Sequence, residues 1–177
     1  MTVMPDMRQR YRESIARFAT GVTVVTAEDG DRLAGMTASA VASLSLEPLL
    51  LLVCVSNHLP THAALERSSC FAVNVLGQGD EALALRFARP TKDKFAGLGL
   101  DHDHGPPLIR RAIAHFVCDT RERLPGGDHS IFIGEIRHCD YTPGRAPLLW
   151  FASTFGAMQQ ADDAFARSCE LWGMAGI

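Results

Sequence analysis

The stretch GMTASAVASLSLEP, residues 35–48, carries small and hydroxyl side chains where a strand normally carries bulky branched ones. The β-branched segment VTVVTA, residues 22–27, precedes it, and the apolar segment LLLLVCV, residues 49–55, follows it directly. Strands favour branched and aromatic residues because these pack well on a pleated surface. Thin side chains instead let a flat, rigid ligand or a neighbouring subunit approach the backbone closely. Composition alone leaves both interpretations open.

The rest of the sequence predicts a mainly β protein with helices placed around the strands. Runs rich in branched and apolar residues, bounded by turn residues, indicate the strands. These are expected at residues 22–27, from 33 into the opening stretch, and at 49–55, 70–76, 112–121, 129–141 and 148–153. Because the strands do not alternate with helices in a βαβ rhythm, a small antiparallel barrel is favoured over a doubly wound parallel sheet.

Four segments have the apolar spacing of helices. In residues 6–19, the apolar side chains of Met7, Tyr11, Ile15 and Phe18 recur on one face and charged residues occupy the other. The glycine- and proline-rich run before the fifth predicted strand, at residues 112–121, indicates a loop rather than a helix. The other helices are predicted at residues 60–67, 79–89 and 159–174, and the loop at 97–107.

The composition is that of a soluble protein with a single domain over residues 1–177. Hydrophobic residues make up 47% of the chain, charged residues make up 21%, and the net charge is −3. This charge does not favour nucleic acid or an anionic membrane as a partner, because both attract clustered lysine and arginine. No signal peptide and no bilayer-spanning run are found, so we expect a cytoplasmic protein.

Several classes of site lack their sequence signatures. The five cysteines are odd in number and form no CxxC pair, which argues against a disulfide framework or a zinc ribbon. Cys54, Cys70 and Cys118 lie in apolar runs and are expected to be buried small hydrophobes. GxGxxG between a strand and a helix, the Walker A loop, GxSxG and HExxH are all missing, so a nucleotide cofactor is not held in the Rossmann manner.

Two histidine-containing segments are candidates for metal sites. DHDH, residues 101–104, has metal-type ligands, but a solvated polar loop accounts for it better because no third strong ligand follows at a recognisable spacing. His58 and His62 lie four residues apart at the start of a predicted helix, where side chains more often cap the helix or face solvent. The free N–H groups of such a helix start suit a phosphate, which draws attention to Ser56 and Thr61. We therefore predict no metal site.

A phosphate-binding or ligand-facing role is open for two further features. Arg86 lies among apolar residues of the helix predicted at 79–89, beside Leu83, Leu85 and Phe87, which are expected near its inner face. It is either an arginine whose charged end reaches solvent or a bidentate clamp on a phosphate. The turn GGDH, residues 126–129, permits positive φ and close approach of another molecule, although such residues are also ordinary in turns.

Together these segments resemble, in order and spacing, the short-chain flavin reductase family, whose fold is the FMN-binding split barrel. The resemblance covers roughly residues 8 to 158, with the tail 159–177 variable. The matching pieces are FATGVTVVTA at 18–27, GMTASAVASLSLEP at 35–48, LLLLVCVS at 49–56, FAVNVL at 71–76, LRFARPTKDKFAG at 85–97, GGDH at 126–129 and IGEI at 133–136. The resemblance implies an antiparallel Greek-key barrel with peripheral helices, usually a homodimer.

The resemblance also implies the functional residues. It places FMN or FAD against the backbone at Gly35, Met36, Thr37, Ala38, Ser39 and Ala40, and beside Cys54, Val55 and Ser56. It places the flavin phosphate near Thr61 and Arg86, and NADH or NADPH near Gly127, Asp128 and His129, with Phe155 at the border of that site. His129 is assigned to positioning the nicotinamide or a phosphate rather than to acid–base catalysis. The thin side chains of residues 35–48 would then be the wall against which the flavin lies.

Two positions depart from the family pattern. Leu49 stands where a second proline often follows Pro48. Residues 57–60, NHLP, lack the arginine or lysine often found before the phosphate-binding serine or threonine, which leaves the choice between FMN and FAD open.

The implied activity is hydride transfer from nicotinamide C4 to flavin N5, with the reduced flavin passed to a partner monooxygenase. Here the cofactors carry the chemistry and the protein supplies orientation and electrostatics. Three alternatives were kept. The first is a flavin-binding split barrel that acts as a carrier or sensor without catalysis; the second is a metal enzyme using DHDH with His115 or His138; the third is a structural dimer.

Overall fold

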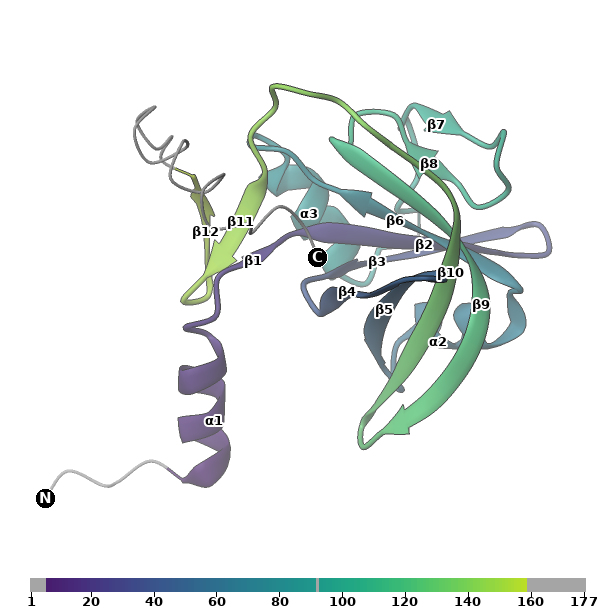
Figure 1. The fold of residues 1–177 in the computed structure, drawn as a ribbon. Helices are drawn as coiled ribbons and strands as arrows, with labels where there is room; N and C mark the ends of the chain where they lie inside the picture. The colour runs from purple at the N-terminus through teal and green to yellow at the C-terminus, as the bar shows by residue number, and fades with distance from the viewer. Residues whose placement is uncertain (1–5, 92, 159–177) are drawn as a thin grey trace, which may run out of the picture.

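The computed structural model describes residues 6–91 and 93–158, which form a mainly antiparallel β structure (Figure 1). Its main sheet has seven strands in the order β3-β2-β6-β9-β10-β5-β4. These strands are β2 (Thr23–Asp29), β3 (Arg32–Ala38), β4 (Val41–Leu46), β5 (Leu49–Ser56), β6 (Cys70–Val75), β9 (Ala114–Gly126) and β10 (His129–Tyr141). A three-stranded sheet holds β1 (Thr20–Gly21), β11 (Leu148–Phe151) and β12 (Thr154–Ala157), and a two-stranded one holds β7 (Leu100–Asp101) and β8 (Leu108–Ile109).

The main sheet curls so that its two edge strands approach one another. The edge strands β3 and β4 are consecutive in the chain, and Ala40 lies between them. The backbone N–H of Cys54, in β5, donates to the Ala40 carbonyl over 3.0 Å. The curvature encloses an apolar core that includes Val25, Val53, Phe71 and Phe132, each with no exposed surface. This arrangement agrees with the predicted antiparallel barrel.

Two of the helices, α2 (Pro60–Arg67) and α3 (Glu81–Ala88), pack on the barrel. The helix α2 follows β5 directly, and α3 follows β6. Leu83 and Phe87 of α3 are buried in a second apolar cluster with Val24 of β2, as expected, whereas Leu85 is 39% exposed. The expectation for Leu85 is wrong because residues two positions apart face opposite sides of a helix, while residues four apart share a side.

The helix α1 (Met7–Ile15) is shorter than predicted and stands apart from the barrel beyond β1 (Figure 1). The predicted apolar face is present, but Met7, Tyr11, Ile15 and Phe18 are all exposed, by 47% to 77%. Helical spacing thus predicted the helix correctly, although no other part of the described chain covers its apolar face. The backbone carbonyl of Ala16 accepts from Ala152 N–H over 2.8 Å, which ties the end of this helix to the β11–β12 turn.

The long β9–β10 hairpin differs most from its predicted bounds. Its first strand was expected to end at residue 121 but continues to Gly126, so the connection has only two residues, Gly127 and Asp128. The loop predicted at 97–107 contains the short strand β7. The helix predicted at 159–174 lies outside the described residues, and the assignment of 1–177 to one domain stays a prediction. None of the described helices is long and apolar enough to cross a bilayer.

The cysteines differ in burial. Cys118 is fully buried in the barrel core, as expected, and burial raises the pKa of its thiol to about 12. Cys54 and Cys70 are half-buried rather than buried: Cys54 faces the outer side of β5, and Cys70 is the first residue of β6.

Candidate functional site

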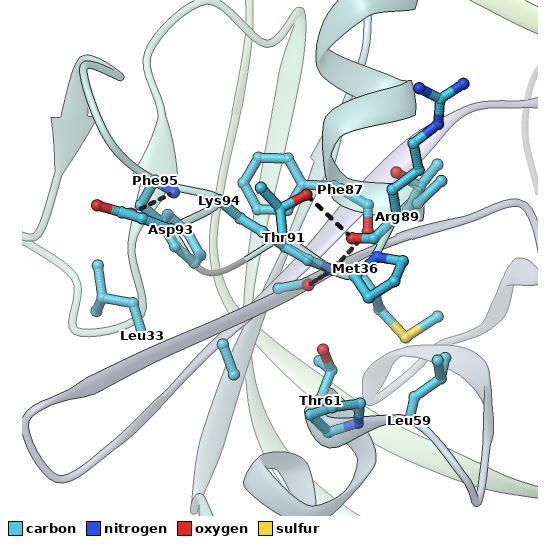
Figure 2. A pocket seen from close by; sticks show the side chains of 16 residues that line it. Leu33, Met36, Leu59, Thr61, Phe87, Arg89, Thr91, Asp93, Lys94 and Phe95 are labelled. Atoms are coloured by element: carbon cyan, nitrogen blue, oxygen red, sulfur yellow. Dashed lines mark hydrogen bonds between the residues drawn. The ribbon is translucent and has the colours of Figure 1, made fainter.

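A cleft of about 790 Å³ opens between the edge strand β3 and the two packed helices. Residues 33–37 of β3 line it, together with residues 59–61 at the start of α2 and residues 87–91 and 93–95 at the end of α3 and after it. Figure 2 shows Leu59 and Thr61 on one side of β3 and Phe87 and Phe95 on the other. Of the residues predicted for the site, the cleft brings together Gly35, Met36, Thr37 and Thr61. The first half of the small-residue stretch therefore does line a cavity.

Gly35 has no side chain because two phenyl rings occupy the space that one would fill. A Cβ placed there would lie 2.7 Å from Cε1 of Phe87 and 3.0 Å from Cζ of Phe95. These two rings meet edge to face, with centroids 5.0 Å apart. The expectation that every thin residue leaves room for a flat ligand is therefore too simple, since at Gly35 the room is used by the protein's own aromatic side chains.

The neighbours of Gly35 fix β3 against the helices. The hydroxyl of Thr37 donates to the carbonyl oxygen of Ala84 in α3 over 2.6 Å. Met36 is only 8% exposed and joins the barrel core, and Figure 2 shows its thioether on the same side of the cleft as Thr61 and Leu59. This wall is thus held by one hydrogen bond to α3 and by apolar packing.

Lys94 places a positive charge at the cleft, although no sequence pattern assigns it a role. Its ammonium group donates to the carbonyl oxygens of Phe87, over 2.8 Å, and Gly35, over 3.1 Å. Partial burial lowers the pKa of Lys94, because the charged form loses hydration. An ammonium group has three N–H donors, so one remains for a ligand. The segment DKF, residues 93–95, belongs to a stretch that resembles the family, but nothing in its spacing distinguishes a lysine that folds back over a strand.

Arg86, predicted to clamp a phosphate, does not line the cleft. Its guanidinium donates to the backbone carbonyls of Ala96, over 2.6 Å, and Asp93, over 3.3 Å. It therefore braces the loop that carries Lys94, and its contact with a phosphate stays a prediction. Arg89, three residues later, lines the cleft instead, although Figure 2 shows its guanidinium directed away from Thr61.

Thr61 lies in the first turn of α2, where backbone donors are free. The residue before this helix is Leu59, which has no capping side chain, and Pro60 has no N–H group. The His62 N–H donates to the Leu59 carbonyl over 3.0 Å, so the Thr61 N–H is the donor left without an intrahelical partner. The Thr61 side chain is 4% exposed and faces the cleft. A helix start of this kind favours an anion.

The turn GGDH lies outside the cleft, at the tip of the β9–β10 hairpin. Gly127 has a φ of +75°, the left-handed conformation that favours glycine. Nδ1 of His129 lies 2.7 Å from Oδ1 of Asp128, and this hydrogen bond is the main reason that the pKa of Asp128 is lowered. His129 pairs with Ser56 in the sheet, so the turn stands beside the junction of β5 and α2. Its predicted nicotinamide role stays a prediction.

The remaining predicted residues fall in four places. Ala38 and Val55 are buried, Cys54 and Ser56 are half-buried and face the other side of β5, and Ser39 and Ala40 are exposed at the turn between β3 and β4. Phe155 packs edge to face on Trp150, with centroids 4.9 Å apart, and belongs to the second apolar cluster. None of these seven residues lines the cleft.

The histidines considered as metal ligands have other partners. His104 and His138 stack with ring centroids 3.7 Å apart, and Nε2 of His115 contacts the Ile109 carbonyl over 2.9 Å. His62, expected to cap its helix or face solvent, instead contacts Ser130 over 2.8 Å. Within residues 6–91 and 93–158, no three potential ligands among His, Cys, Asp and Glu gather around one point. The metal-enzyme alternative therefore gains no support.

Comparison with known proteins connects this geometry to a family. The reductase component of 4-nitrophenol 4-monooxygenase/4-nitrocatechol 2-monooxygenase from Rhodococcus opacus is 36% identical over 168 residues, covering 95% of this chain and 90% of that protein. The reductase component of 4-hydroxyphenylacetate 3-monooxygenase from Thermus thermophilus is 37% identical, covering 82% of this chain and 93% of that protein.

A solved structure of a flavin-using oxidoreductase is similar as well. The NADH:FAD oxidoreductase SgcE6 of Streptomyces globisporus, in complex with NAD and FAD fragments, superposes with a TM-score of 0.82 at 37% identity, covering 93% of this chain and 99% of that one. This similarity confirms the predicted split-barrel fold. The model of the flavin reductase like domain matches residues 15–159. The chain therefore belongs to the flavin reductase-like family.

Proposed function

We propose that this chain is an NAD(P)H-dependent flavin reductase that transfers hydride from nicotinamide C4 to N5 of FMN or FAD and supplies reduced flavin to a partner monooxygenase. Relatives at 36% and 37% identity are reductase components of monooxygenases, and SgcE6, at 37%, is an NADH:FAD oxidoreductase. The observation that carries the proposal is the convergence of Thr61 and Lys94 on a cleft whose wall is β3.

The cleft residues fit a flavin nucleotide. The volume of about 790 Å³ lies within the usual range of roughly 300–1,000 Å³ for small-molecule sites. Leu33, Met36 and Leu59 give it apolar walls that suit the face of a ring. The free N–H of Thr61 and the ammonium group of Lys94 are the donors that a phosphate needs.

Bound flavin supplies the hydride acceptor at N5, and the protein orients the two partners. Thr61 and Lys94 bind the phosphate, and β3 excludes water from one side of the cleft. Arg86 acts by bracing the loop that carries Lys94. Asp128 accepts a hydrogen bond from Nδ1 of His129, which leaves Nε2 of that ring for the nicotinamide.

We also propose a homodimer. Leu44, Leu46 and Leu49 are 44% to 61% exposed on β4 and the start of β5, and the apolar face of α1 is exposed too. Apolar surface gathered on an edge strand is typical of an interaction site. A cytoplasmic location stays a prediction, favoured by the use of NADH or NADPH.

The test is a flavin-dependent oxidation assay. NADH and NADPH are each combined with FMN and FAD, and loss of nicotinamide absorbance is followed while flavin affinity is measured by fluorescence quenching. Rapid oxidation that requires both flavin and protein is expected. Tight flavin binding without oxidation would overturn the reductase in favour of the carrier or sensor, and no flavin binding would overturn both.

A further inference from the structure

A chain of side-chain hydrogen bonds joins α2 to the tip of the β9–β10 hairpin, outside the cleft. Nε2 of His62 lies 2.8 Å from Oγ of Ser130, which in turn lies 2.9 Å from Oδ1 of Asn57. Nδ2 of Asn57 donates to the carbonyl of Gly127 over 3.3 Å. The chain thus crosses three segments: α2, β10 and the link between β5 and α2.

The direction of every bond in this chain is determined. The amide group of Asn57 must turn its nitrogen to the Gly127 carbonyl, because the opposite orientation would set two oxygens against each other. Its oxygen then accepts the single hydroxyl proton of Ser130. Since Ser130 has no second proton to give, its oxygen accepts from His62, and the imidazole carries its proton on Nε2. No member competes with another for a donor.

One end of the chain fixes the turn that carries His129. The backbone N–H of Asn57 donates to the carbonyl of Asp128 over 3.0 Å, while its side chain holds the carbonyl of Gly127. Both residues of the two-residue turn are therefore held by Asn57. Asp128 in turn bonds Nδ1 of His129, so the orientation of this imidazole depends on the turn.

The other end of the chain lies next to the cleft. His62 follows Thr61 directly in α2, and its side chain is only 16% exposed. Its ring meets Phe132 of the barrel core edge-on, with centroids 5.6 Å apart, so the ring is held by packing as well. The chain therefore spans from the first turn of α2, at the cleft, to the tip of the hairpin.

We propose that His62, Ser130 and Asn57 are positioning residues that set the distance between the nicotinamide at His129 and the flavin in the cleft at Thr61. This inference rests on the proposed function. Hydride transfer requires the reacting atoms to be held about 3–3.5 Å apart, and small misplacements cost much of the rate. A chain in which each hydrogen bond has one donor and one acceptor restrains the turn relative to α2 for that purpose.

The primary test compares Ser130→Ala with Ser130→Thr, using Ser69→Ala as the control. Ser130→Ala breaks both side-chain bonds yet keeps the backbone pairing of β10, whereas Ser130→Thr keeps the hydroxyl. Ser69 is an exposed serine. We expect Ser130→Ala to raise the KM for NADH about tenfold, the size expected for one lost hydrogen bond, with the flavin Kd changed less than about twofold. Ser130→Thr and Ser69→Ala should stay within about twofold of the parent protein.

A second variant tests whether the residues act as one chain. His62→Leu removes the first donor, and His62→Gln keeps an N–H donor at the same end. Because Ser130→Ala already disconnects His62, the double variant with His62→Leu should be no worse than Ser130→Ala alone. The proposal would be overturned if the rise in the KM for NADH in the double variant equalled the product of the rises in the two single variants. It would also be overturned if Ser130→Ala weakened flavin and nicotinamide binding equally, which would indicate a general structural role.

Hydrogen exchange separates this inference from the proposed function. The amide hydrogens of Asp128 and His129 should exchange faster in Ser130→Ala than in the parent, whether or not the protein oxidises NADH. Faster exchange in a protein without reductase activity would show that the chain fixes the turn and would reject the reductase, and with it the spacing of nicotinamide and flavin. Unchanged exchange together with an unchanged KM for NADH would overturn the positioning role while leaving the reductase intact.

Discussion

The two halves of GMTASAVASLSLEP have the same kind of residues and opposite environments. In β3, Gly35, Met36 and Ala38 are buried between the barrel core and the rings packed on α3. In β4, residues 42–44 are exposed, and Leu44 and Leu46 are 44% and 61% exposed. Small residues are thus used in β3 to admit other groups closely, whereas in β4 they accompany leucines on an uncovered edge strand.

Small residues therefore have two different roles in this stretch, which their composition alone does not distinguish. The β3 half lines the cleft and is fixed from behind by Phe87 and Phe95, so its shape is set within one chain. The β4 half lines no part of that cleft, and no other part of residues 6–91 and 93–158 covers its exposed leucines, which the proposed dimer would bury. Changes in β3 should therefore alter the folding of a single chain, and changes in β4 should alter association.

The largest effect is expected from Gly35→Val. Its Cβ would lie 2.7 Å from the ring of Phe87, and two further methyl groups would follow. Forcing several carbons into a packed site should lower the free energy of unfolding by about 3 kcal/mol or more. Urea denaturation followed by circular dichroism measures this.

The matched control for Gly35→Val lies in the other half. Ala42→Val adds carbons to the exposed strand β4, where a branched side chain is favourable, and should change the free energy of unfolding by less than about 0.5 kcal/mol. If both variants lost similar amounts of free energy of unfolding, the two halves would be equally tightly packed, which would contradict the difference between β3 and β4.

The next effect concerns association. Leu46→Glu puts a charge on the exposed part of β4 and should weaken the proposed dimer by about 2 kcal/mol, the value of burying one leucine, which is a 10- to 100-fold rise in its Kd. Sedimentation velocity over a range of concentrations measures it. The monomer should remain folded, and a dimer of unchanged Kd would place the interface elsewhere.

A smaller effect on the free energy of unfolding is expected when one hydroxyl is removed from each half. Thr37→Val removes the 2.6 Å bond to the Ala84 carbonyl and should cost about 1 kcal/mol of stability. Ser43→Ala removes an exposed hydroxyl of β4 and should cost less than about 0.5 kcal/mol. Thermal unfolding of both variants distinguishes them, and equal melting temperatures would contradict the idea that β3 is pinned to α3.

The sequence predicted the strands, α2 and the fold well because each depends on local pattern and on motifs in order. The helix α2 and the strand β10 match their predicted bounds, at Pro60–Arg67 and His129–Tyr141. It did not predict that the apolar face of α1 is left exposed within the described residues, because helical spacing shows which side chains share a face and not what packs on that face. The role of Lys94 was also missed, since its ammonium group meets Gly35, a residue 59 positions away, through a loop whose path no periodicity encodes.

The smallest effect is a dependence of stability and of phosphate affinity on pH. It involves Lys94, whose ammonium group donates to the Gly35 carbonyl of β3. Burial lowers its pKa below the ordinary value of about 10.4, so the unfolded chain binds more protons than the folded one in the interval just below that value. For the free protein, this group therefore makes stability rise with pH across that interval. Phosphate binding depends on pH in the opposite direction, because a phosphate binds the charged ammonium group more tightly than the neutral amine.

The affinity for FMN relative to riboflavin should therefore fall severalfold as the pH rises through the lowered pKa of Lys94. The phosphate of FMN is already fully ionised there, with its second pKa near about 6, and both flavins share the same ring, so their ratio reports the phosphate contact alone. Fluorescence titration from neutral pH upward measures this ratio. Lys94→Arg should abolish the fall, since arginine stays charged throughout. A ratio that does not change with pH in the parent protein, or that falls equally in Lys94→Arg, would show that the phosphate lies away from Lys94 and that β3 contacts only the ring.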